Sequence, residues 1–135
     1  DHLLQLDKRR RKIEDFDYGD HWAEIDGHGE NLIICWGSLA AACREAAMYL
    51  REDGIDTRVV ALRLLAPLDT AKLGEILADA RRILIVEQTH SEQFHNYLRA
   101  NADLGGEVSV LARPGPLPIR PGEIIEKIAK DWRSQ

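Results

Sequence analysis

The sequence predicts an α/β fold, a three-layer αβα sandwich built on a mostly parallel sheet. Apolar runs without polar alternation occur at residues 32–36 and 83–86, and such runs are typical of strands that helices cover on both faces. Apolar residues at helical spacing follow each predicted strand, so that four strand–helix units succeed one another along the chain. Each crossover is long enough for the right-handed connection of parallel strands.

The prediction is organised around Asn31–Ser38, where an apolar strand ends at a turn and a helix follows at once. Gly37 can turn the backbone sharply without a Cβ clash. Ser38 is expected to accept hydrogen bonds from the unpaired N–H groups of the next helical turn. That helix is expected to end at Gly54 and to bury Leu39, Ala42, Cys43, Ala46 and Leu50.

The second unit consists of a β-branched strand over residues 57–62 and a helix that begins beyond Pro67, since proline cannot lie inside a helix. Asp69 is the expected N-cap of this helix. Leu68 and Leu73 are spaced for a hydrophobic staple at the same end.

The third and fourth units follow the same plan. A strand over residues 82–87 precedes a helix for which Thr89 and Glu92 have capping-box spacing. A pair of glycines at 105 and 106 ends that helix, and a strand over residues 107–112 follows. A proline-rich loop then leads to a final helix that Pro121 opens.

Residues 1–30 are assigned to a leading helix and a connector, and residues 31–135 to the α/β domain. The leading helix is expected over Asp1–Phe16, and Trp22–Ile25 could form a short edge strand. The basic run Lys8–Lys12 is interpreted as a solvated segment, with a contact to another subunit as the alternative.

The polar residues of the connector allow the hypothesis of a metal site, but it is not the preferred one. His21, Asp26 and His28 lie close together in the sequence, but their spacing matches no local ligand pattern. A surface loop is therefore preferred.

Composition narrows the class of protein. A chain of 135 residues with 44% hydrophobic and 30% charged residues fits one globular domain with a core. The net charge of −5 argues against nucleic-acid binding, and no apolar run is long enough to span a membrane. Cys35 and Cys43 lack C-x-x-C spacing, so we expect unpaired core thiols in a reducing, cytoplasmic compartment. No signal-peptide pattern is visible, and the start at Asp1 suggests a fragment of a longer protein.

Candidate ligand or partner loops follow the carboxyl ends of the strands, where ligands of such sheets bind. The candidate residues in these loops are Gly37, Ser38, Glu87, Gln88, His90 and Arg113. No residue is assigned a catalytic, cofactor-binding or metal-binding role.

Each candidate has a structural interpretation beside the functional one. Gly37 lacks the further glycines of a dinucleotide-binding loop, and no Walker loop occurs. Glu87 is preferred as a polar loop anchor over a ligand contact. Ser38 is preferred as a helix cap over a nucleophile, because no base can be assigned to it. His90 and His95 could act as bases, but their spacing on a helix points them in different directions.

Three motifs resemble those of a known family. They are Trp36-Gly37-Ser38, the run Val86-Glu87-Gln88 before a helix with Gln93 and Leu98-Arg99, and Arg113–Pro118 followed by Glu123-Ile124. With the basic segment Lys8–Lys12, they resemble the transketolase-C-like domain of the α subunit of 2-oxoacid:ferredoxin oxidoreductases. The chain departs from that pattern after Glu87, where Thr89 and Ser91-Glu92-Gln93 replace an Asn and a Gly-Gln pair.

The resemblance implies a domain of a multi-subunit enzyme. That enzyme oxidatively decarboxylates a 2-oxoacid, captures the acyl group on coenzyme A and reduces ferredoxin through iron–sulfur clusters. Thiamine diphosphate and magnesium are implied for the full enzyme, between another domain of the α subunit and a β subunit, and no cofactor is expected in this chain. The domain itself is expected to supply packing and assembly surface. The alternative is a free-standing flavodoxin-like module that binds a small anion or nucleotide.

Overall fold

The computed structural model describes residues 19–63, 65–66 and 68–132, and in this part of the chain the predicted α/β sandwich is confirmed. The strands are β1 (Ala23–Asp26), β2 (Asn31–Trp36), β3 (Thr57–Leu62), β4 (Arg82–Glu87) and β5 (Glu107–Ala112). The α-helices are α2 (Ala40–Glu52), α3 (Thr70–Ala78), α4 (Gln93–Asn101) and α5 (Pro121–Asp131). Short 3-10 helices, η1 (Gly19–Trp22) and η2 (Gly37–Leu39), precede β1 and α2. The predicted helix over Asp1–Phe16 and the basic run Lys8–Lys12 lie outside the described residues.

The strands form one mixed sheet in the order β1-β3-β2-β4-β5. All neighbouring pairs are parallel except β1 and β3, which pair antiparallel. The edge strand that the sequence allowed at Trp22–Ile25 is β1, shifted by one residue. Because β2 lies at the centre of the sheet, the stretch that organised the sequence prediction also occupies the middle of the fold.

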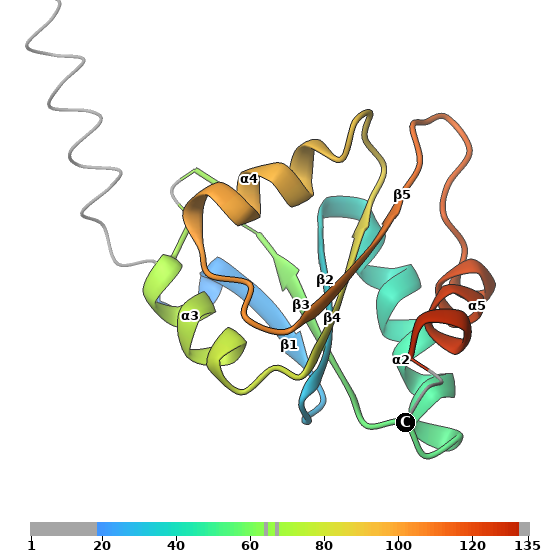
Figure 1. Cartoon of the computed structure of the whole chain (residues 1–135). Coiled ribbons are helices and arrows are strands. Elements are labelled where there is room, and N and C mark those ends of the chain that lie inside the picture. Colours follow the sequence, from blue (N-terminus) through green and yellow to red (C-terminus); the bar gives the residue numbers. More distant parts are fainter. Residues whose placement is uncertain (1–18, 64, 67, 133–135) are drawn as a thin grey trace, which may run out of the picture.

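Helices cover both faces of the sheet, with α3 and α4 on one face and α2 and α5 on the other (Figure 1). The strand β4 shows why its sequence is continuously apolar. Leu84 and Val86 belong to the core under α2 and α5, whereas Ile83 and Ile85 belong to the core under α3 and α4. All four side chains are fully buried, as expected for a strand that is covered on both sides.

Local signals explain most of the helix boundaries. Asp69 caps α3 as predicted, because its Oδ1 accepts a hydrogen bond of 3.0 Å from the backbone N–H of Lys72. Pro121 is the first residue of α5, where its missing N–H costs nothing. The helix α4 already ends at Asn101, before the glycine pair that was expected to end it.

The two cysteines are free thiols in the core, as predicted. Cys35 comes from β2 and Cys43 from α2, and both are fully buried. A hydrogen bond with Cys35, followed by burial, raises the pKa of the Cys43 thiol far above its usual range.

Candidate functional site at the carboxyl edge of the sheet

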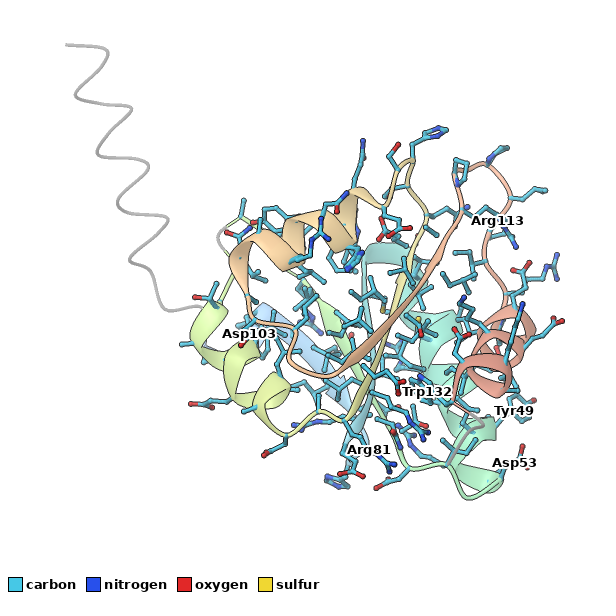
Figure 2. All side chains as sticks on the ribbon, in the orientation of Figure 1. Tyr49, Asp53, Arg81, Asp103, Arg113 and Trp132 are labelled. Carbon is cyan, nitrogen blue, oxygen red and sulfur yellow. The ribbon has the colours of Figure 1, made fainter. Side chains whose placement is uncertain are left out.

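The strands β2 to β5 all end at one edge of the sheet, which we call the carboxyl edge. Their parallel registers pair Trp36 with Leu62 and Glu87 with Ala112, so the loops that follow these strands lie at the same edge. Figure 2 shows Arg113 at this edge and Arg81 at the opposite one. The fold therefore gathers the predicted loops, as the parallel topology requires.

The turn after β2 forms as expected at Gly37 but not at Ser38. Gly37 has a φ of +67°, a left-handed conformation in which a Cβ is unfavourable. Ser38 is exposed within η2, and no side-chain hydrogen bond caps η2 or α2. The prediction that Ser38 caps the helix is wrong, because the 3-10 turn at residues 37–39 takes the chain directly into α2.

Glu87 is a fully buried carboxylate that holds the first turn of α4. Its Oε1 accepts a hydrogen bond of 2.9 Å from the backbone N–H of Phe94, and its Oε2 accepts one of 2.9 Å from that of His95. The hydroxyl of Thr89 also donates to Oε1. A carboxylate at a helix N-terminus is favourable because it pairs unsatisfied N–H groups and interacts with the helix dipole.

The capping box predicted for Thr89 and Glu92 does not form, because Glu87 takes its place. The N-cap of α4 is Glu92, which adopts a left-handed conformation with a φ of +53° and makes no side-chain cap. The Glu92 carboxylate instead lies 3.0 Å from Nδ1 of His95. The sequence signal failed here because a residue from the preceding strand supplied the acceptors.

Two further candidates, Gln88 and Arg113, hold the loop between β5 and α5. The side-chain amide of Gln88 donates to the backbone carbonyl of Leu117. Arg113 donates to the carboxylate of Glu123, and also to the carbonyl of Pro118 at 3.3 Å. The hydrogen bond from Arg113, together with one from the backbone N–H of Arg120, lowers the pKa of the Glu123 carboxyl. The guanidinium of Arg113 is thus already paired with an acid.

At this edge, the Glu92 carboxylate and the His95 ring are 3.0 Å apart. Among the described residues, no group of three or more His, Cys, Asp or Glu side chains is placed to hold a metal ion. His90 is exposed, and Asp26 pairs with Arg51 through a 3.3 Å contact at the other end of β1. In the same residues, no helix has the length and apolar character needed to cross a bilayer.

Sequence reasoning missed the hollows on either side of Trp36, where the carboxyl edge is open. The smaller hollow has a volume of about 150 Å³ and is lined by Trp36, Leu65, Thr89, Gln93, Phe94 and Tyr97. The larger has a volume of about 320 Å³ and is lined by Glu24, Trp36, Gly37, Ala40, Ala61, Leu62 and Arg63. The available signal was a tryptophan that ends an otherwise buried strand.

Comparison with known proteins finds one matching family, described as the C-terminal domain of transketolase. It matches residues 22–94, just over half of the 135 residues. The match begins just before β1 and ends in the first turn of α4, so it includes the central strands of the sheet.

Curated relatives include α subunits and synthases. The α subunit of 2-oxoacid:ferredoxin oxidoreductase 1 from Aeropyrum pernix is 32% identical over 67% of this chain and 15% of its own length. The α subunit of the second such enzyme of that organism is 27% identical over 80% of this chain and 18% of its own length. The 1-deoxy-D-xylulose-5-phosphate synthase of Geobacillus thermodenitrificans is 33% identical over 50% of this chain and 11% of its own length. The chain therefore spans less than a fifth of the length of these relatives.

A solved structure shares the fold. The 2-oxoglutarate:ferredoxin oxidoreductase from Magnetococcus marinus, with 2-oxoglutarate, coenzyme A and succinyl-CoA bound, superposes with a TM-score of 0.78. The superposition covers 96% of this chain and 23% of that one, at 24% sequence identity. This likeness supports the sandwich architecture.

Proposed function

The chain belongs to the transketolase C-terminal domain family, and from this membership we propose that it is the assembly domain of the α subunit of a 2-oxoacid:ferredoxin oxidoreductase. The full enzyme would oxidatively decarboxylate a 2-oxoacid, form an acyl-CoA and reduce ferredoxin. The two Aeropyrum pernix α subunits support this assignment, because they are 32% and 27% identical over 67% and 80% of this chain. We place the enzyme in the cytoplasm, in keeping with the two free core thiols.

The burial and hydrogen bonding of Glu87 support the proposal that this domain supplies no catalytic group. It is the acid at the end of the central strand β4, where an α/β enzyme could present a catalytic group. Here both carboxylate oxygens accept hydrogen bonds from α4, and the side chain is fully buried. A carboxylate that serves as a helix anchor is not available to bind substrate or move a proton.

The part of the chain that the structure describes is also a poor fit for thiamine diphosphate and its magnesium ion. Magnesium with a diphosphate needs one or two convergent carboxylates or other oxygen ligands. At the carboxyl edge, Glu87 is buried and Glu123 is bonded to Arg113. We therefore expect the cofactor, the iron–sulfur clusters and the sites for coenzyme A and ferredoxin to lie in the remainder of the α subunit and in other subunits.

The flavodoxin-like alternative requires an anion or nucleotide site at the same edge. Arg113, the cation among the predicted site residues, is already paired with Glu123, and Gly37 is not followed by a glycine-rich loop. The described carboxyl edge thus offers poor support for this reading.

Co-purification with the remainder of the parent polypeptide tests the proposal. The full-length subunit and its β partner are expected to form a complex that reduces an electron acceptor only when a 2-oxoacid and coenzyme A are present. Deletion of residues 19–135 should abolish the complex. The isolated chain, titrated with magnesium and thiamine diphosphate in a calorimeter, should release no heat of binding into the millimolar range. Micromolar affinity, or a deletion that leaves an active complex, would overturn the assembly role.

A further inference from the structure

Trp36 differs from the two other tryptophans of the chain in its exposure. The indole of Trp36 is 40% exposed, whereas Trp22 and Trp132 are each 5% exposed. One side of the ring packs on Phe94, with ring centroids 6.3 Å apart. The two hollows lined by Trp36 lie next to it. We call Trp36 with the residues that line these hollows the Trp36 surface.

The smaller hollow is suited to an apolar side chain. Phe94, Leu65 and the rings of Trp36 and Tyr97 contribute to its walls. Its two hydroxyl groups are already paired, because that of Tyr97 donates to the carbonyl of Leu65 and that of Thr89 donates to Glu87. The side chain of Gln93 is the other polar group of the lining. A dry cavity of about 150 Å³ accommodates a group the size of benzene. A leucine, methionine or phenylalanine side chain would therefore fit it better than a polar ligand.

Exposed polar side chains border the larger hollow, as at the rim of a protein–protein interface. Arg63 and Arg44 both approach the carboxylate of Glu24, at 3.5 and 3.4 Å. The Arg63 and Glu24 side chains are each 50% exposed, so their pair is solvated and weak. Apolar anchors at the centre with partly exposed polar pairs around them are typical of protein–protein contacts.

The direction of β1 shows that the chain enters the sheet close to the Trp36 surface. Ala23, at the start of β1, pairs with Leu62 at the end of β3, and the N–H of Arg63 donates to the carbonyl of Trp22 at 2.9 Å. The chain therefore enters the sheet at the carboxyl edge, beside the larger hollow, which Arg63 and Leu62 line. Any part of the same subunit that precedes residue 1 is joined covalently to this edge of the sheet, and a short flexible tether raises the effective concentration of a docking segment to the millimolar range.

We propose that the Trp36 surface is the docking site for the part of the same subunit that precedes residue 1, with one of its large apolar side chains in the smaller hollow. The proposal rests on the proposed function in taking the chain as one domain of a longer subunit. The relatives agree with that premise, because the chain covers 15% and 18% of the two α subunits.

Thiol labelling at a single engineered site tests the proposal. Gln93 is exposed and lines the smaller hollow, and Met48 is 48% exposed on α2, across the sheet. Cys35 and Cys43 are fully buried. Among the described residues, the accessible thiol of each variant is therefore the one introduced by Gln93→Cys or Met48→Cys. The labelling rate of each variant is measured with a maleimide in the 135-residue chain and in the full-length subunit, with the modified peptide identified by mass spectrometry.

The thiol of Gln93→Cys is expected to react at least about 10-fold more slowly in the full-length subunit than in the chain alone, as for a site that reacts only after local opening. The thiol of Met48→Cys should react within about threefold of the same rate in both. Equal rates for Gln93→Cys would overturn the proposal. So would protection in the chain alone that grows with protein concentration, because a second copy would then be the occupant.

The same full-length preparation separates this proposal from the proposed function. An enzyme that oxidises 2-oxoacids but leaves the thiol of Gln93→Cys reactive would refute the docking site alone. Protection of that thiol in a subunit without 2-oxoacid activity, even with its β partner, would refute the function and support the docking site.

Discussion

Replacing Glu87 by glutamine should destabilise the protein although it changes only one atom of the side chain. The carboxylate accepts hydrogen bonds from the backbone N–H groups of Phe94 and His95, each at 2.9 Å, and from the hydroxyl of Thr89. The amide of Glu87→Gln has one oxygen to accept these bonds. Its NH₂ group must face one of the two backbone N–H donors, which it cannot satisfy.

The expected loss follows from these contacts. Leaving one buried backbone N–H without an acceptor costs about 1–3 kcal/mol. Removing the negative charge from the N-terminus of α4 costs roughly a further 0.3–1 kcal/mol. We therefore expect Glu87→Gln to lower the free energy of unfolding by about 1–4 kcal/mol, which corresponds to a fall in melting temperature of roughly 4–14 °C for a chain of this size.

Urea unfolding, followed by circular dichroism, measures this change. Glu45→Gln is the matched control, because Glu45 lies exposed on α2, where the same substitution should alter stability by less than about 0.5 kcal/mol. Amide hydrogen exchange should also accelerate at Phe94 and His95 in Glu87→Gln. A change below about 0.5 kcal/mol in Glu87→Gln would show that the carboxylate does not hold α4, and would reopen its assignment as a ligand.

Three further predictions concern the turn, the core and the last helix. Gly37→Val should cost about 1–3 kcal/mol in urea unfolding because of the positive φ, whereas Gly74→Ala within α3 should stabilise by about 1 kcal/mol; equal effects would contradict the strain at Gly37. The thiol of Cys43, whose pKa is raised by its hydrogen bond with the other core thiol and by burial, should react with a disulfide reagent only after unfolding. The pKa of Glu123, measured by NMR titration, should lie below its ordinary 4.5 and rise in Arg113→Ala. Since the folded-state pKa is the lower one, this pair's stabilisation is present above pH 4.5 and is lost as the pH falls through the folded value.

The sequence predicted the sheet well because its signals are local and strong. Continuous apolar runs in β2 and β4 need no knowledge of neighbours to be read as buried strands. The caps at Asp69 and Pro121 were also correct, since each acts within its own helix. These features lie within a few residues of one another along the chain.

The errors occur where hydrogen-bond acceptors or packing partners come from another part of the chain. The start of α4 was predicted from the spacing of Thr89 and Glu92, but the buried Glu87 provides the acceptors from the preceding strand. Ser38 was expected to cap a helix that a 3-10 turn opens instead. The hollows at Trp36 depend on Leu65 and Tyr97, which come from other loops and helices and only meet in three dimensions.

Two of the charged groups at the carboxyl edge have structural partners, which supports the proposed assembly role. These are Glu87, which is bonded to α4, and Arg113, which is paired with Glu123. At the Trp36 surface, the exposed tryptophan lies among exposed polar side chains, namely Glu24, Arg63 and Gln93. Substitutions here should consequently fall into two classes. Substitutions at Glu87 or Arg113 should lower stability, and on the docking proposal those at Trp36 or Leu65 should weaken docking. On the proposed function, turnover per assembled enzyme should stay within about twofold of the original. The reason is that neither class removes an interaction made only in a transition state.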